Sequence, residues 1–315
     1  MRRMEIGGWA PTGLLAALGT VACLAMSPGS ARAQVASAES GLRVYISADM
    51  EGVVGTVTGD QLGPSGFEYQ RFREIMTREV NAAIEAARRA GVTEILVSDS
   101  HGNGENLLME LLPQDIQLIR SWPRPLGMME GIDESFDAVI FIGYHASTAN
   151  PRGVRAHTLS SANLTGLKLN GVEHPEAGLN AAIAGHFGVP VVMISGDDAI
   201  VEEARGLLGD VEGAVTKWSL GFHSARTVMP EESYRRIGAA VTRALARRDT
   251  FRPYRLEYPV TLELSFKNYL PAEVLAFLPG VERADSHSIR FLGKDILEIS
   301  RFLRVATGYR PDLRP

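Results

Sequence analysis

The sequence predicts an α/β fold: a mostly parallel sheet with helices on both faces, plus a smaller C-terminal α+β portion. The 315 residues are 45% hydrophobic and 22% charged, which is ordinary for a folded protein of one large or two smaller domains. Up to about residue 215, apolar strand-like runs alternate with helix-like periodic segments, a pattern typical of parallel sheets covered by helices. Beyond that point the alternation is replaced by a helix, a strand and a last helix.

The elements of the first part follow from apolar periodicity. Residues 42–49 have few polar breaks, which indicates a central parallel strand. Residues 68–91 place apolar side chains at intervals of three and four, which predicts a helix that stops at Gly91. Asn170 and Gly171 are typical of a tight hairpin turn. The other predictions are strands at 93–101, 115–121, 137–145 and 189–198, a Gly-rich loop at 59–66, a hairpin at 164–174 and a helix at 176–188.

The C-terminal portion, residues 216–315, has a different pattern. An amphipathic helix is predicted at 230–248, an alternating strand at 258–266 and a last helix at 293–307. We expect this portion to serve packing or oligomerisation beside the larger domain at 34–215.

The first 33 residues predict a secretory signal peptide. Arg2 and Arg3 precede an apolar run of about a dozen residues, and small residues lead to a cut between Ala33 and Gln34. This run is short for a bilayer span, and a retained membrane anchor is the alternative. We therefore expect a periplasmic or secreted protein with no membrane association in its mature form.

Cysteine content and charge narrow the possible partners. Cys23 is the only cysteine, so the mature chain is expected to lack disulfides although it enters an oxidising compartment. Removal of three Arg and one Glu with residues 1–33 changes the net charge from −5 to about −7. An acidic chain without a basic stripe binds nucleic acid poorly, so no nucleic-acid partner is expected.

Polar residues that can bind metal or take part in catalysis follow four of the predicted strands. Because the carboxyl ends of parallel strands lie along one edge of a sheet, such residues meet there. Glu176 joins them if its helix begins at the same edge, and His157 lies in the loop after the strand at 137–145. The residues at the strand ends are Asp49 and Glu51; Asp99, Ser100 and His101; Tyr144 and His145; and Asp197 and Asp198.

Each of these residues also has a purely structural explanation. Asp49 and Glu51 taken alone would be solvated turn residues, and we favour a helix-capping role for Asp197. His145 can be a hydrogen-bonded core histidine, and Glu176 an acid that faces a helix macrodipole. The histidines without comparable context are expected on the surface or in packing: His174, His186, His223 and His287.

The residue types indicate a metal centre that performs hydrolysis. Two histidines and three carboxylates are ligands that suit zinc or manganese. Asp49 and Glu51 repel each other unless cations neutralise them, and a bridging carboxylate can hold two divalent ions about 3.5–4 Å apart. Such ions polarise a carbonyl and lower the pKa of bound water towards about 7.

His157 is the candidate catalytic residue. Its ordinary pKa near 6.5 suits proton transfer at neutral pH. It can deprotonate a metal-bound water, protonate the leaving amine or attack the carbonyl, and the sequence does not separate these roles.

Several motifs occur together and in order: "SADMEG" from Ser47, "SDSH" from Ser98, "GYHA" from Gly143, "AHT" from Ala156 and "EAGLN" from Glu176. In these motifs, and in "EGIDES", "SGDD" and "FKNY", the chain from about residue 42 resembles the zinc D-aminopeptidases encoded with bacterial dipeptide-transport systems. The resemblance implies a mixed α/β fold, two Zn²⁺ per subunit, a closed homo-oligomeric ring and release of N-terminal D-amino acids. Members with this pattern are cytoplasmic, whereas this chain carries an export signal.

The resemblance also assigns roles to individual residues. It makes Asp49 the bridging carboxylate, with Glu51 and His145 as ligands of one zinc. His101 and Glu176 resemble the ligands of the other zinc, and His157 matches the catalytic histidine of the family.

We therefore hypothesise a metallo-aminopeptidase that acts on short peptides. The substrate's free amine needs an anion nearby, for which Asp99 or Asp197 is the candidate. A binuclear amidase or esterase on another small substrate, and a periplasmic metal-binding protein without catalysis, are the alternatives.

Overall fold

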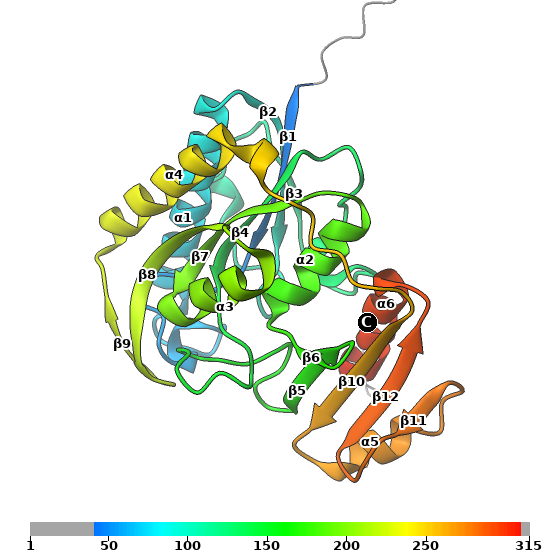
Figure 1. Ribbon diagram of the computed structural model, residues 1–315. Coiled ribbons are helices and arrows are strands. Elements are labelled where there is room, and N and C mark those ends of the chain that lie inside the picture. The colour runs from blue at the N-terminus through cyan, green and yellow to red at the C-terminus, as the bar shows by residue number, and fades with distance from the viewer. Residues whose placement is uncertain (1–40, 310–315) are drawn as a thin grey trace, which may run out of the picture. The chain divides into compact units, whose positions relative to one another are not determined.

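Two sheets organise the computed structural model, which describes residues 41–309 (Figure 1). The predicted signal peptide at 1–33 lies outside the described residues. The first sheet has the order β3-β2-β1-β4-β7-β8-β9 and the second the order β11-β12-β10-β5-β6. The strands of the first sheet are β1 (Leu42–Ala48), β2 (Val92–Asp99), β3 (Gln117–Ile119), β4 (Ala138–Tyr144), β7 (Val191–Asp197), β8 (Glu212–Gly221) and β9 (Ser224–Thr227).

The first sheet is parallel except at one edge, where β9 runs antiparallel to β8. β1 lies between β2 and β4, and both β4 and the second half of β1 are buried, as expected for central strands. The prediction of a mostly parallel sheet is confirmed. Its consequence is that the ends of β1, β2, β4 and β7 share one edge.

Helices cover both faces of this sheet (Figure 1). On one face, α1 (Tyr69–Arg89) and α4 (Pro230–Ala246) pack together, in one core with Val44 and Ile46 of β1. On the other, α2 (Glu176–His186) and α3 (Asp198–Leu208) pack against β4, β7 and β8, with Tyr45 in that core. Successive residues of β1 are thus buried in the cores on opposite faces of the sheet, as the two-residue period of a strand requires.

Two predicted local signals have the expected geometry. The helix at 68–91 is α1, and Gly91 follows its cap with a φ of 91°. The hairpin turns through Asn170 and Gly171, both with positive φ (50° and 80°), as a type I′ turn requires. Left-handed backbone at two successive residues explains the Asn-Gly pair.

The second sheet combines segments from both predicted parts of the chain. β5 (Leu164–Leu169) pairs with β10 (Val260–Phe266), and α5 and α6 pack on this sheet. Its other elements are β6 (Val172–Glu173), β11 (Val281–Arg283), β12 (Ser288–Gly293), α5 (Tyr269–Leu275) and α6 (Ile296–Gly308). The expected division near residue 215 falls inside β8, and residues 41–309 belong to one compact unit. The pairing of β5 with β10 joins a segment before residue 215 to one after it, so this sheet includes both predicted parts of the chain.

None of the helices within 41–309 is both long enough and apolar enough to cross a bilayer.

Glu79 on α1 is a buried acid in the interface with α4. Its Oε1 accepts hydrogen bonds from Ser233 Oγ at 2.7 Å and from the amide of Val54 at 3.1 Å. Its Oε2 is buried and has no partner among the described residues. Burial raises the pKa of Glu79 from 4.5 to about 7, because the ionised carboxylate is poorly solvated there.

We expect Glu79→Gln to stabilise the protein increasingly as pH rises. Between pH 4.5 and about 7 the unfolded chain ionises Glu79 while the folded chain keeps the proton, so rising pH lowers wild-type stability. A shift of this size corresponds to at most about 3 kcal/mol. Urea unfolding from pH 4.5 to 8 should show a growing stability difference in favour of the variant. Glu85→Gln, on the exposed side of α1, is the control and should show none. A difference for Glu79→Gln that does not change with pH would contradict the assignment.

Candidate metal centre

The structure brings all six predicted site residues into one pocket of about 600 Å³. The pocket lies at the carboxyl edge of the first sheet, where the sequence predicted it. Four of the residues follow the ends of three strands, one comes from the start of α2 and one from the loop between β4 and β5. The six residues are Asp49 and Glu51 after β1, His101 after β2, His145 after β4, His157 in the loop and Glu176 on α2.

Asp49 lies between two imidazoles. Its Oδ1 is 3.1 Å from His101 Nδ1, and its Oδ2 is 3.2 Å from His145 Nε2. The carboxylate is 2% exposed, so both contacts are sheltered from solvent. This is the position that a carboxylate bridging two cations requires.

The other two carboxylates separate into two groups. Glu51 Oε2 lies 2.8 Å from His101 Nδ1, and Glu176 Oε1 lies 3.4 Å from His145 Nε2. The resemblance pairs Glu51 with His145 and His101 with Glu176, whereas these distances place Glu51 beside His101 and Glu176 beside His145. Which of these residues share an ion stays a prediction. Glu176 stands near His145 because α2 packs on β4. Each of the two candidate ligand groups places its three ligand atoms within 4.8 Å of one another: Asp49, Glu51 and His101; and His145, His157 and Glu176.

All three histidines are oriented by backbone carbonyls. A carbonyl oxygen can only accept, so the ring nitrogen that faces it carries the proton. The other nitrogen of each ring faces the carboxylates, and it would become an unprotonated ligand atom when a metal ion binds, as in metal sites whose histidines are oriented from behind. The three bonds run from His101 Nε2 to Leu62 O (2.8 Å), from His145 Nδ1 to Ala146 O (3.1 Å) and from His157 Nδ1 to Arg155 O (2.7 Å).

The donor set fits divalent cations. Asp49 Oδ2 and Glu51 Oε2 are buried, and each lies near one imidazole nitrogen but makes no hydrogen bond of normal geometry within residues 41–309. Imidazole nitrogens and carboxylate oxygens in this mixture suit zinc. A cation between the groups would satisfy both the orphan oxygens and the imidazole lone pairs.

The pKa shifts of the site residues also indicate a cation-binding site. Burial raises the pKa of Asp49, and the neighbouring Glu51 charge adds to this shift. Burial disfavours protonated His101, yet the Glu51 and Asp49 carboxylates raise its pKa well above 6.5. Similarly, Glu176 and Asp49 raise the pKa of His145 despite burial. The buried carboxylates are therefore stabilised by positive charge. A metal ion can supply this charge and displace the protons from the histidine nitrogens that face the carboxylates.

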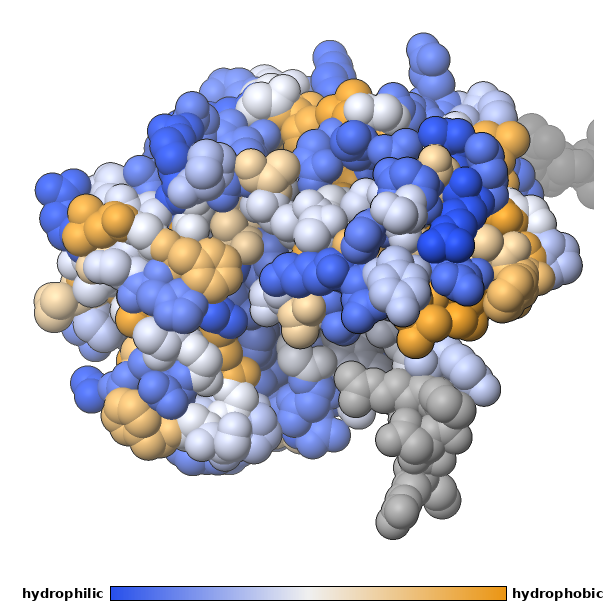
Figure 2. Space-filling view, turned by 90° about the horizontal axis from the view of Figure 1, so that it is seen from below, coloured by the Kyte–Doolittle hydropathy of each residue, from blue (hydrophilic) through white to orange (hydrophobic). Residues whose placement is uncertain are grey.

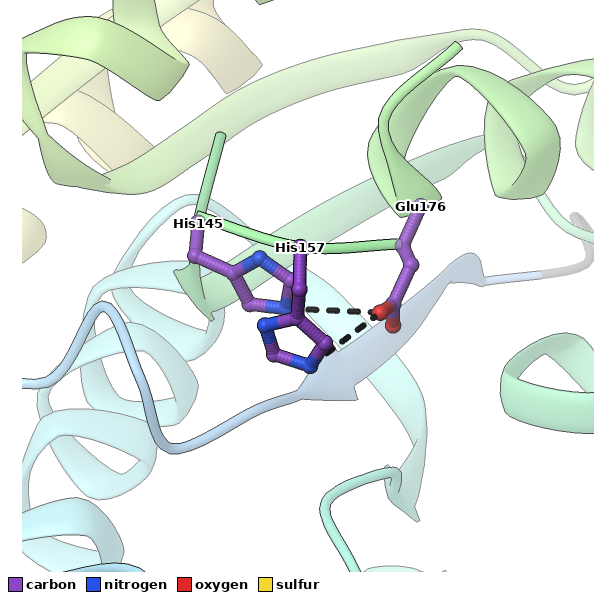
Figure 3. Close-up of side chains that lie close together, drawn as sticks. All are labelled: His145, His157 and Glu176. Carbon is purple, nitrogen blue, oxygen red and sulfur yellow. Dashed lines mark ion pairs between the residues drawn. The ribbon is translucent and has the colours of Figure 1, made fainter. Parts of the chain in front are cut away.

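His157 differs from the other two histidines. Its ring stacks on His145 with centroids 4.0 Å apart, and 12% of its side chain is exposed. Its Nε2 is 3.8 Å from Glu176 and 3.9 Å from Glu51, farther than the other histidine–carboxylate contacts (Figure 3). Burial, reinforced by the His145 charge, lowers the pKa of His157 below 6.5. A neutral imidazole with an available Nε2 can act as a base or nucleophile, and it can also bind metal.

Two glycines allow the ends of β1 and β4 to approach. Gly52 donates from its amide to Gly143 O at 2.7 Å. A Cβ added at Gly52 would lie 1.9 Å from Tyr144 O, and one at Gly143 would lie 2.2 Å from Asp49 O. Side chains there would separate Asp49 from His145.

Lys217 of β8 supports the ligand loop from behind and was missed from the sequence. It is fully buried, and its Nζ donates to the carbonyls of Glu51, Val53 (3.0 Å) and Thr56 (2.7 Å). These bonds hold the turn that carries Glu51. The available signal was a lysine within an otherwise strand-like segment.

Neither acid predicted to bind the substrate amine faces the pocket. Asp99 accepts two bonds from Asn106 and one from the amide of Leu107. Asp197 caps α3 by accepting from the amide of Ile200 at 2.9 Å. The amine-binding prediction is therefore wrong, and the capping role of Asp197 is confirmed. None of the other described histidines lines the pocket: His174 is buried against Tyr254, and His186, His223 and His287 lie elsewhere.

Comparisons with known proteins agree over almost the whole described chain. The sequence profile of the D-aminopeptidase family matches residues 42–305. A D-aminopeptidase of Bacillus subtilis (strain 168) is 33% identical over 270 residues, which cover 84% of this chain and 97% of that protein. The solved structure of Zn-dependent D-aminopeptidase DppA from Bacillus subtilis, described as a self-compartmentalizing protease, is similar with a TM-score of 0.82 at 32% identity. That likeness covers 87% of this chain and 100% of the DppA chain.

The grouping of ligands predicts how metal content changes on substitution. The mature chain should bind two zinc ions, and Asp49→Asn should lower binding to both. His101→Ala should remove the ion held with Glu51, and Glu176→Gln the ion held with His145, which leaves about one per chain in each case. Elemental analysis after dialysis measures this, with His287→Ala on the exposed surface as control. Two ions retained in both single-group variants would refute the grouping.

Proposed function

Because the chain belongs to the D-aminopeptidase family, we propose that its metal centre releases N-terminal D-amino acids from short peptides by a two-zinc mechanism. The family match makes the chain a metal-dependent hydrolase of the aminopeptidase class. The two-ion arrangement rests on one observation: Asp49 lies between two ligand groups, within 3.2 Å of an imidazole on each side.

The ligands and the catalytic group have separate tasks in this proposal. Asp49 would bridge the two ions, Glu51 and His101 would hold one, and His145 and Glu176 would hold the other. When bound, zinc supplies Lewis acidity to the scissile carbonyl and lowers the pKa of water. His157 keeps its Nδ1 proton on Arg155 O, so Nε2 is the nitrogen that accepts a proton, donates one or attacks the carbonyl.

The substrate amine is recognised beside the metal centre. The carboxylates among the described lining residues are Asp49, Glu51 and Glu176, all of them proposed ligands. A neutral amine can bind a metal ion as a ligand, so we infer that the substrate's N-terminus lies at the metal centre. The first peptide bond, and not a later one, would then lie at His157.

Loss of His157 should abolish catalysis without removing metal. We expect residues 34–315 with zinc to hydrolyse D-alanyl p-nitroanilide but not its N-acetylated form. His157→Ala should keep the metal content and lower the rate about 10²- to 10⁴-fold, since proton transfer in the transition state would be lost. Cleavage of the N-acetylated compound would favour a general amidase or esterase. If the wild-type enzyme with bound metal hydrolysed neither amide, the proposal would be refuted.

We also propose that the chain forms a homo-oligomer. The similar DppA protein is described as self-compartmentalizing. In this chain, Leu270, Val274 and Phe277 follow one another at intervals of four and three residues and are 55%, 52% and 79% exposed. Leu270 and Val274 belong to α5, and Phe277 follows directly after it. The face of the molecule seen from below carries apolar groups interspersed with hydrophilic ones (Figure 2). Such spacing forms one apolar stripe on a helix.

Substitution in this stripe should reduce the assembled mass. Phe277→Glu introduces a charge that an apolar interface cannot solvate, so sedimentation should show smaller species than the wild type. Phe67→Glu changes an equally exposed phenylalanine, 82% exposed and outside the stripe, and should leave the mass unaltered. A wild type that sediments as a monomer would end the oligomer proposal.

A further inference from the structure

The pocket of the metal centre has a single guanidinium. Arg304 of α6 is the only Lys or Arg among the described lining residues. The ligand residues of the metal centre line this pocket together with Trp122, Pro123 and Met128. A fixed positive charge thus faces the same cavity as the three carboxylates.

Arg304 is held in place by α6 and by a glycine turn. Ser300 Oγ donates to Pro125 O at 2.9 Å, which ties α6 to the segment before the 3₁₀ turn Gly127–Met129. The guanidinium of Arg304 rests against this turn, because a Cβ added at Gly127 would lie 3.4 Å from its Cζ and Nη1. The head group therefore occupies a defined place although no side chain binds it.

The hydrogen-bonding capacity of Arg304 is unused. Within residues 41–309, Arg304 has neither a hydrogen bond nor an ion pair, and its Nε is buried. Nearby Arg124 shows the contrast, because it donates to Ser98 Oγ and to the carbonyls of Ser121 and Asp99. Arg304 is partly exposed, but its buried Nε has no partner, and a carboxylate can satisfy it together with an Nη through two parallel N–H bonds.

We propose that Arg304 binds the C-terminal carboxylate of the substrate, so that the enzyme is specialised for short peptides with a free C-terminus. This inference rests on the proposed aminopeptidase function. A cavity of about 600 Å³ lies within the usual range for small ligands and accommodates a dipeptide or tripeptide. Arg304 would hold the peptide carboxylate through paired charge-assisted hydrogen bonds, and this contact would fix the orientation of the peptide in the pocket.

The experiment compares D-alanyl-glycine with D-alanyl-glycinamide, which differ only in the terminal carboxylate. Wild-type enzyme with zinc should prefer the acid about 10- to 100-fold in kcat/KM, mostly through KM, because charge-assisted hydrogen bonds of this kind are lost with the amide. Arg304→Met should remove this preference by weakening hydrolysis of the acid and leave the amide within a few-fold. Arg304→Lys, which keeps the charge without the planar fork, should retain part of the preference. Arg301→Met, on the exposed side of the same helix, is the control and should behave as wild type.

A binding measurement separates recognition from rate. In a His157→Ala background, calorimetry should show tighter binding of the acid than of the amide, and Arg304→Lys should narrow the difference even if Arg304→Met does not fold. Equal kcat/KM for the acid and the amide in the wild type would overturn the inference, and so would an equal fall of both values in Arg304→Met. In either case hydrolysis of the amide by the wild type would still support the aminopeptidase function. Failure of the wild type to cleave either compound would remove the proposed function, and this inference with it.

Discussion

The close approach of β1 and β4 at their carboxyl ends is the constraint on which the site depends. Gly52 and Gly143 let the two backbones touch where any side chain would collide with a carbonyl oxygen. The amide of Asp49 donates to Ile142 O at 2.8 Å across this junction. As a result, the Asp49 carboxylate emerges beside His145 on one flank and reaches His101 of the neighbouring strand on the other. A loss of this contact would separate the two ligand groups that share Asp49.

Charge balance around this junction explains why the surrounding polar groups are where they are. Asp49, Glu51 and Glu176 are buried together, which is unfavourable unless positive charge compensates them. Histidine nitrogens face them in front, and Lys217 binds the carbonyls of the ligand loop from behind. Arg304 lines the same pocket and feels the charge of Glu176, but it forms no ion pair among the described residues, so its guanidinium remains available to a ligand. The buried acids therefore account for metal binding at this site.

Much of the fold and of the ligand set could be predicted because the signals are local. The buried character of β1 and β4, the periodicity of α1 with its stop at Gly91, and the Asn170-Gly171 turn each depend on a few consecutive residues. The polar residues after the strands could be placed on one edge because parallel strands all end there. The partition into ligand groups could not be predicted in this way. It depends on which side of Asp49 each side chain lies, and here Glu51 lies beside His101 and Glu176 beside His145, a different proximity from the one that the resemblance implies.

The sequence by itself determined the parallel sheet and the six residues at its edge, since strand ends and residue types are written in the order of the chain. Only the tertiary structure decided what lies around those six. The pairing of β5 with β10, the burial of Lys217 beneath Glu51 and the presence of Arg304 in the pocket lining each join segments that are far apart in the chain. A hydrophobic pattern shows which face of an element is buried but not which distant element covers it. Contacts of that kind arise when the two sheets and their helices pack, and they determine which surface of the metal centre a peptide meets.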